Sequence, residues 1–273
     1  MDAAPLEGMT IGITAERRAA EQADLFRRRG AEAVFGPAMR SVVEGHDEAL
    51  HAATVELIRR PPDFVLASTG FGMRTWFAAA DRAGLKAELL AALSRARVAN
   101  RGAKAASANI AAGLEQWWRA PGERFEELVE RVLEEDLAGN QVAVQLHGGP
   151  MPEAVARLEA AGASVVQIDA YRARMPADTG PARQLIDAAC DGHLAAVTFT
   201  AAPAVHNLFA IAAQAGREDD LRRALNGPVV AGCVGPVCAK GAVEEGIEAP
   251  VVPAQARLVP LVQAVTDSLA ERS

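Results

Sequence analysis

The stretch Ala163–Pro176, ASVVQIDAYRARMP, decides the fold of this chain. It begins as an apolar run typical of a buried strand, and it ends in Tyr171-Arg172 before a proline stops it. Tyr171 is the only tyrosine in 273 residues. A similar stretch near the start, AEAVFGPAMR at residues 31–40, ends in Arg40. We interpret the two stretches as the crossovers of a duplicated protein with two lobes, and we expect the functional site between the lobes.

The two halves of the chain repeat each other at a nearly constant offset. Pairs of identical residues lie 132 or 133 positions apart: Gly30 and Gly162, Arg40 and Arg172, Phe77 and Phe209, Gly102 and Gly235, and Gly113 and Gly246. An internal repeat of this kind indicates two copies of one structural unit. We therefore expect two similar lobes.

Short apolar runs alternate with segments rich in helix formers. TIGIT at 10–14, DFVLAS at 63–68 and RVANRG at 97–102 are typical of buried strands. Strands that alternate with helices favour parallel α/β sheets. Between the two halves we expect an acidic helix at 123–137 to form a bridge, and Trp117-Trp118 to end a helix or pack at the linker.

The composition excludes several classes of protein. A net charge of −7 argues against a general nucleic-acid binder, and no apolar run reaches the ~18 residues of a membrane span. The start, MDAAPLEGMT, lacks the pattern of a secretion signal, so we expect a cytoplasmic protein. The three cysteines form no CxxC pair and the five histidines show no metal-binding spacing, so we expect reduced thiols and no metal.

Four glycine-containing turns each follow a predicted strand and open a predicted helix. They are STGFG at 68–72, RGAK at 101–104, QLHGGP at 145–150 and VGPVCAK at 234–240. Backbone N–H groups at helix N-termini favour carboxylates or phosphates, and ligands of open α/β sheets bind at the carboxyl ends of strands. None of the turns matches a dinucleotide GxGxxG motif or a P-loop, which argues against NAD, FAD and ATP.

These turns and the neighbouring strand ends supply the candidate ligand-binding residues. They are Arg17, Thr69, Gly70, Arg101, Lys104, His147, Gly148, Gly149, Arg172, Thr200, Gly235 and Cys238. The alternative for each arginine or lysine is an ordinary surface charge, and for Cys238 buried packing. Tyr171 is the candidate proton donor, because a phenol stays protonated at neutral pH. Its alternative is a tyrosine that caps a strand with its hydroxyl group in water.

Eight segments of the sequence, in their order and spacing, resemble the uroporphyrinogen-III synthase family, especially its actinobacterial-type branch. They are ITAERRA, VLASTGFGMRTW, NRGAKA, VAVQLHGGP, DAYR, AVTFTAAPAV, VGPVCAKGAVEEGI and VVPAQARLVPLVQAV. The resemblance implies two Rossmann- or flavodoxin-like lobes with parallel sheets, joined by a two-stranded antiparallel linker. One lobe would comprise residues 1–37 and 174–273 and the other 41–169, with crossovers near 36–40 and 169–176.

The resemblance also implies an activity. Members of the family cyclise hydroxymethylbilane, a linear tetrapyrrole polycarboxylate, with loss of water and inversion of ring D. The reaction would need no cofactor, since the pyrroles supply the electrons, and we expect a monomer. Tyr171 would assist the departure of the hydroxyl group, and the twelve residues named above would bind the substrate.

Two other functions stay open at this point. The same two-lobed fold could act as a non-catalytic tetrapyrrole sensor, since some similar proteins are fused to a C-terminal DNA-binding domain. We find no helix-turn-helix pattern in this sequence. Ala201 and Cys238, which stand where the family often has hydroxyl side chains, favour that alternative. A racemase-like enzyme would need cysteines in both halves, and the first half has none.

Overall fold

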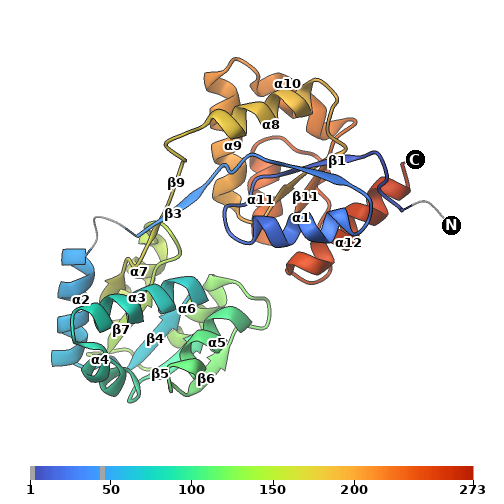
Figure 1. Ribbon diagram of the computed structural model, residues 1–273. Coiled ribbons are helices and arrows are strands. Elements are labelled where there is room, and N and C mark those ends of the chain that lie inside the picture. The colour runs from blue at the N-terminus through green and yellow to red at the C-terminus, as the bar shows by residue number, and fades with distance from the viewer. Residues whose placement is uncertain (1–3, 44–46, 273) are drawn as a thin grey trace. The chain divides into compact units, whose positions relative to one another are not determined.

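The chain folds into two compact units in the computed structural model, which describes residues 4–43 and 47–272. Unit 1 is Met1–Arg40 with Arg174–Ser273, and unit 2 is Ser41–Ala173. The chain passes between them in β3 (Arg40–Val42) and β9 (Arg172–Arg174), which pair as a small antiparallel sheet (Figure 1). The predicted fold class, two parallel α/β lobes with an antiparallel linker, is confirmed.

Within the described residues, unit 2 has a five-stranded parallel sheet. Its strands, in order across the sheet, are β6 (Gln116–Arg119), β5 (Arg97–Asn100), β4 (Phe64–Ala67), β7 (Gln141–Gln145) and β8 (Ser164–Ile168). Its helices are α2 (Asp47–Arg59), α3 (Gly70–Arg82), α4 (Lys86–Leu93), α5 (Ala103–Ala111), α6 (Phe125–Leu133) and α7 (Pro152–Ala160).

The central strand of this sheet is buried on both sides, because helices cover both faces of the sheet. In β4, Val65 and Ala67 pack into one core with residues of α2, α3, α4 and α5. Phe64 and Leu66 point the other way, into a second core with α6 and α7. All four residues are fully buried, as expected for a strand of a parallel sheet between two helical layers.

In the part of unit 1 that the structure describes, a four-stranded parallel sheet forms the centre. Its order is β11 (Val230–Cys233), β10 (Ala196–Phe199), β1 (Thr10–Ile13) and β2 (Glu32–Phe35). Its helices are α1 (Ala19–Arg27), α8 (Gly180–Cys190), α9 (Ala202–Gln214), α10 (Glu218–Asn226), α11 (Pro236–Glu244) and α12 (Leu258–Ala270).

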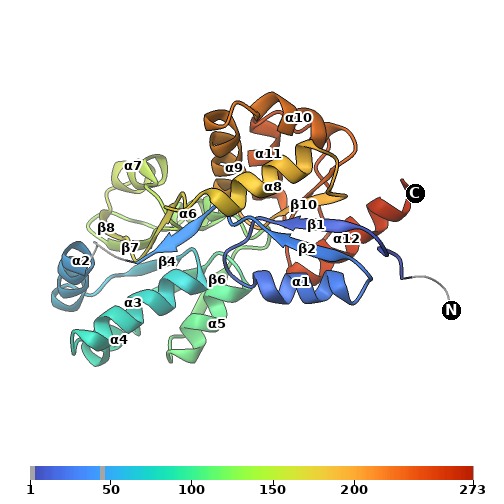
Figure 2. The same cartoon turned by 45° about the horizontal axis from the view of Figure 1, so that its top comes forward.

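Unit 1 is layered in the same way. Helices α8, α9, α10 and α11 share one core with Val197 and Phe199 of β10. Helices α1 and α12 share the other core with Ile11 and Ile13 of β1. Figure 2 allows the reader to follow α1 and α12 along one face of this sheet.

The predicted repeat relates the elements of the two halves. Strands β4 and β10 begin 132 residues apart, as do α3 and α9, while β5 and β11, and α5 and α11, begin 133 apart. The units are nevertheless not the two halves of the sequence. The unit 1 sheet combines β1 and β2 of the first half with β10 and β11 of the second half, and the unit 2 sheet combines β7 and β8 of the second half with β4, β5 and β6 of the first half. The duplicated halves have therefore exchanged their first β-α-β segments.

Two expectations about the middle of the chain are wrong. Trp117 and Trp118 lie in β6, an edge strand, and end no helix. Trp117 packs edge-on against Phe64 with ring centroids 5.7 Å apart. Aromatic residues favour strands in which they can pack in this way, and this segment is therefore a strand. The acidic segment is not a bridge either: α6 packs its apolar face, including Leu128 and Val132, against the sheet of unit 2.

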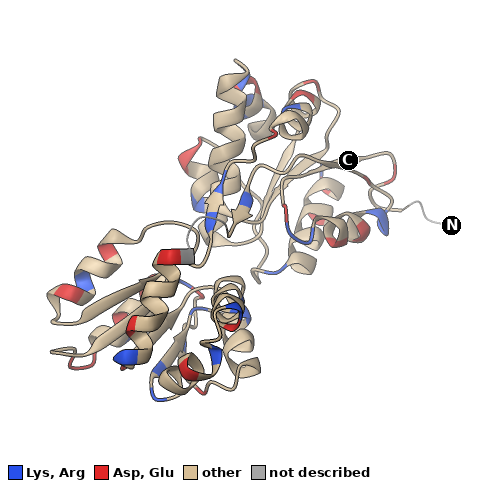
Figure 3. Ribbon diagram, turned by 60° about the vertical axis from the view of Figure 1, so that its left-hand side comes forward, with Lys and Arg blue, Asp and Glu red and all other residues tan. Residues whose placement is uncertain are grey.

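Charged residues of both signs lie on the helices and loops of each unit (Figure 3). Many of them pair locally, as Arg222 does with Glu218 at 2.5 Å in α10. Exposed pairs of this kind contribute little to stability, about 0–1 kcal/mol each. Among the described residues, no helix has both the length and the apolar character needed to cross a membrane.

Candidate functional site

The predicted ligand-binding residues form two groups, one at the carboxyl edge of each sheet. Each of the four predicted turns follows a strand and opens a helix, so this part of the prediction is confirmed. In unit 2 the residues follow β4, β5, β7 and β8: Thr69, Gly70, Arg101, Lys104, His147, Gly148, Gly149, Tyr171 and Arg172. In unit 1 they follow β1, β10 and β11: Arg17, Thr200, Gly235 and Cys238.

Thr69 forms the N-cap of α3 at the centre of the unit 2 edge. Its backbone is extended (φ −139°, ψ 140°), and its Oγ1 accepts a hydrogen bond from the N–H of Gly72 at 3.0 Å. A threonine in this position satisfies one of the unpaired N–H groups of the first helical turn. The same Oγ1 lies 3.4 Å from the hydroxyl oxygen of Tyr171. Thr69 thus joins the start of α3 to the segment after β8.

Tyr171 is held against the same helix start. Its ring meets the ring of Phe71 edge-on, with centroids 4.9 Å apart and planes at 79°. Tyr171 is only 5% exposed, so most of its side chain is packed against the protein and not in solvent. A buried tyrosine needs a hydrogen-bond partner, and the Thr69 hydroxyl supplies one.

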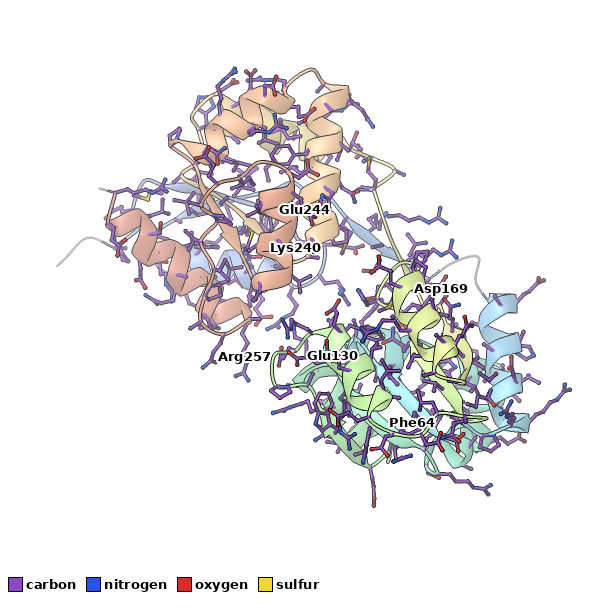
Figure 4. All side chains as sticks on the ribbon, turned by 180° about the vertical axis from the view of Figure 1, so that it is seen from behind. Phe64, Glu130, Asp169, Lys240, Glu244 and Arg257 are labelled. Atoms are coloured by element: carbon purple, nitrogen blue, oxygen red, sulfur yellow. The ribbon has the colours of Figure 1, made fainter. Side chains whose placement is uncertain are left out.

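The segment that carries Tyr171 is anchored on both sides. Arg172 donates from Nε to Oδ2 of Asp169 at 2.8 Å, and the N–H of Ala173 donates to the carbonyl of Gly148 at 2.9 Å. Figure 4 labels Asp169, just after β8, and Phe64, at the amino end of β4, at opposite ends of unit 2. The anchors and Tyr171 therefore lie at the carboxyl edge, where ligands of parallel sheets bind.

Arg101 and His147 determine the electrostatics of this edge. Burial lowers the pKa of the Arg101 guanidinium, while Tyr171 and Glu123 act in the opposite direction; an arginine remains charged at neutral pH. Desolvation, with Arg101 second, lowers the pKa of His147 to about 4. The His147 ring lies 5.8 Å from the ring of Phe125. At pH 7 the site thus combines a cationic Arg101 with a neutral His147.

Gly70 has a structural reason to be glycine. A Cβ atom at this position would lie 2.1 Å from the carbonyl oxygen of Lys104, at the start of α5. Only glycine allows the first turns of α3 and α5 to approach so closely. The two helix N-termini therefore lie side by side and face the same edge of the sheet.

The family model for uroporphyrinogen-III synthase HemD matches residues 20–263. The chain belongs to the uroporphyrinogen-III synthase family. It is similar to the Bacillus subtilis protein named uncharacterized protein YjjA, with 29% identity over 242 residues and 89% of each chain covered.

Two crystal structures of the Thermus thermophilus enzyme resemble the whole chain. The mutant uroporphyrinogen III synthase has a TM-score of 0.75 at 27% identity, covering 97% of this chain and 100% of its own. The wild-type enzyme in another crystal form has a TM-score of 0.59 at 28% identity, covering 97% and 99%. The resemblance to the uroporphyrinogen-III synthase family is thus confirmed.

The unit 1 edge of this uroporphyrinogen-III synthase family member carries fewer functional groups. Ala201 begins α9 with the extended backbone of Thr69 but without a hydroxyl group. Cys238 is 3% exposed, and the neighbouring thiol of Cys233, together with burial, raises its pKa. A neutral buried thiol is a poor nucleophile. Arg17 is exposed after β1, and Gly235 begins α11.

Gln145 and Phe71 lie in two of the predicted turns, but neither was predicted as a site residue. Gln145 is the last residue of β7, fully buried, and its Oε1 accepts the N–H of Thr69 at 2.8 Å. A signal was present, because most polar side chains that are buried at the end of an apolar strand such as QVAVQ are hydrogen-bonded. Phe71 carried no comparable signal, since its contact with Tyr171 joins distant segments.

Proposed function

We propose that this chain is an active uroporphyrinogen-III synthase. It closes hydroxymethylbilane, a linear tetrapyrrole polycarboxylate, into uroporphyrinogen III, with loss of water and inversion of ring D. The observation that carries this proposal is the Tyr171 hydroxyl group, 3.4 Å from Oγ1 of Thr69 at the carboxyl edge of unit 2. Membership of the uroporphyrinogen-III synthase family over residues 20–263 supports it.

Tyr171 assists departure of the substrate's hydroxyl group. Thr69 can donate its hydroxyl hydrogen to the Tyr171 oxygen, because Oγ1 already accepts from the N–H of Gly72. The phenolic hydrogen is then available to the leaving oxygen, which departs as water. The cation left on the chain is stabilised by its own pyrrole nitrogen. General acid assistance of this kind contributes about 10²–10⁴-fold.

Arg101, Lys104 and the starts of α3 and α5 bind carboxylates of the substrate. The guanidinium group supplies positive charge, and the helix N-termini supply N–H donors and the positive end of the helix dipole. His147, neutral at pH 7, contributes a hydrogen bond and no charge. The overall charge of −7 makes such local cations necessary for an anionic substrate.

The substrate's orientation determines the product. The free substrate closes to the uninverted isomer, so the protein has to present the substituted carbon of ring D to the cation first. The new carbon–carbon bond gives a spiro intermediate; the old bond to ring D then breaks, ring D closes inverted through its unsubstituted carbon, and the proton released from that carbon restores the phenol. Holding two reacting atoms in one geometry is among the largest contributions that a binding site makes to rate.

A product assay tests the proposal. The protein is incubated with freshly generated hydroxymethylbilane, and the two uroporphyrinogen isomers are separated after oxidation to porphyrins. We expect the inverted isomer in clear excess over a protein-free control. An isomer ratio equal to the control overturns the proposal. Substrate binding without conversion would instead favour the tetrapyrrole sensor, a role consistent with the missing hydroxyl group at Ala201.

A further inference from the structure

Gln145 connects two of the turns at the unit 2 edge. Its Oε1 accepts the Thr69 N–H at 2.8 Å and faces Thr69 Oγ1 at 3.4 Å. Its Nε2 donates to the backbone carbonyl of Leu146, and the backbone carbonyl of Gln145 accepts a hydrogen bond from the Ser68 hydroxyl group. Both ends of the amide group are used, so its orientation is set by these contacts.

The first turn of α3 leaves room for the Gln145 amide group because residue 72 is glycine. A Cβ atom on Gly72 would lie 2.1 Å from Nε2 of Gln145 and 2.9 Å from Oγ1 of Thr69. Glycine at position 72 therefore allows the amide to sit directly beside the N-cap. Gln145 and Ser68 are 0% and 2% exposed. At such buried positions a hydrogen bond is electrostatically stronger than in water, and an unpaired polar group lowers the stability of the fold.

The matching position of the other copy has no such group. Ile13 stands 132 residues before Gln145, at the end of β1 in unit 1, and the α9 N-cap there is Ala201. Ala201 has φ −159° and ψ 143°, close to the values of Thr69. An α9 start without the glutamine adopts the same backbone, so the glutamine is not needed merely to form such a turn.

We propose that Gln145 is a positioning residue that orients the Thr69 hydroxyl group and, through it, the hydroxyl group of Tyr171. The Gln145 amide holds the N–H of Thr69, the N-cap geometry aims Oγ1, and Oγ1 contacts the phenolic oxygen. Gln145 acts on the reaction only through these two residues. This inference rests on the proposed function in assigning the reaction to Tyr171.

The first test reads the environment of Tyr171 without using activity. Because Tyr171 is the only tyrosine, biosynthetic 3-fluorotyrosine places a single ¹⁹F label at this position. We expect Gln145→Met to move or broaden the ¹⁹F resonance. The matched control is Gln141→Met in the same strand: Gln141 is also fully buried, and its side-chain nitrogen and oxygen have no hydrogen-bond partner in the described residues. It should leave the resonance in place.

The second test measures turnover with hydroxymethylbilane. We expect Gln145→Met to lower kcat about tenfold, the effect of roughly 1.4 kcal/mol on the barrier, with KM changed less than about twofold. Gln145→Glu, which keeps an acceptor for the Thr69 N–H, should recover part of kcat. Combining Gln145→Met with Tyr171→Phe should lower kcat no further than Tyr171→Phe alone, because both changes act on the same hydroxyl group.

The outcomes of the two tests distinguish failure of the proposed function from failure of the positioning role of Gln145. Wild-type protein that forms no excess of the inverted isomer refutes the proposed function, and the ¹⁹F experiment still tests the positioning by Gln145. An unchanged ¹⁹F resonance in folded Gln145→Met protein overturns the inference, as does full kcat. Equal losses in Gln145→Met and Gln141→Met also overturn it, since they would indicate general damage to β7. If Gln145→Met fails to fold, Gln145→Ala, which also removes both ends of the amide group, is labelled and measured in its place, with the same criteria.

Discussion

The carboxyl edges of the two sheets have the same backbone but different side chains. Where unit 2 has Thr69, Asn100, Gln145 and Tyr171, unit 1 has, 132 or 133 residues away, Ala201, Cys233, Ile13 and Met39. The backbone angles hardly differ: φ and ψ are −158° and 179° at Gly102, and −178° and 179° at Gly235. The strand and helix packing therefore shapes the turns in both copies, and the polar side chains of unit 2 are available for function.

The largest expected effect comes from the one tyrosine. Tyr171→Phe keeps the ring contact with Phe71 but removes the proton donor. We expect kcat to fall about 10²–10⁴-fold with the fold retained. Met39→Leu changes the matching position in unit 1 and should keep the full rate. Comparable losses in both variants, or a fully active Tyr171→Phe protein, would remove the proposed asymmetry between the edges.

Arg101 tests the difference in charge between the edges, because Val234 occupies its matching position. Arg101→Gln removes a charged donor, and a hydrogen bond to a charged group is worth about 1.5–3 kcal/mol. We therefore expect KM for hydroxymethylbilane to rise about 10–100-fold, measured by initial rates. Arg95→Gln makes the same charge change at an exposed position before β5 and should leave KM unchanged. An equal rise in both variants would point to overall charge instead.

Thr69 and Ala201 allow the comparison to be made in both directions. Thr69→Ala removes the N-cap of α3 and should lower the free energy of unfolding by about 1 kcal/mol. Ala201→Thr supplies a cap to α9, whose N-cap backbone is already extended, and should raise the free energy of unfolding by up to about 1 kcal/mol. Urea denaturation measures both. A destabilising Ala201→Thr would show that the two turns differ more than their angles indicate.

The smallest expected effect is a pH dependence at His147, whose matching residue in unit 1 is Ala15. Its pKa in the folded protein is lowered to about 4 from 6.5, so between these values the unfolded chain binds the proton more readily. Stability should therefore decrease as pH falls from about 6.5 to 4. Since His147 is exposed to solvent, solvent reduces the effect.

Urea titrations at pH 7.5 and pH 5 measure this pH dependence. His147→Gln should lose less stability than the wild type between the two conditions. His51→Gln, at an exposed position on α2, should behave as the wild type. A His147→Gln protein with the same loss as the wild type would contradict the lowered pKa.

Much of the fold could be predicted from local features of the sequence. The strands, the helices after the glycine turns and the offset repeat depend on short-range periodicity and turn chemistry, which each segment carries by itself. The exception was β6, where Gln116–Arg119 is too short for its period to be read and pairing with β5 decides the conformation. The edge positions of Thr69, Arg101 and Tyr171 followed from the rule that ligands bind at strand ends.

The sequence by itself determined that this protein has parallel α/β sheets, a duplicated plan and basic, glycine-rich turns at its strand ends, because spacing and residue type suffice for these. The family resemblance implied which segments share a lobe, but only the tertiary structure decided the order of the strands in each sheet, since that order depends on pairing between distant strands. It also decided that Gln145, Thr69 and Tyr171 meet, across separations of 76 and 102 residues. Contacts of that range arise from packing of the whole unit, and no local pattern encodes them.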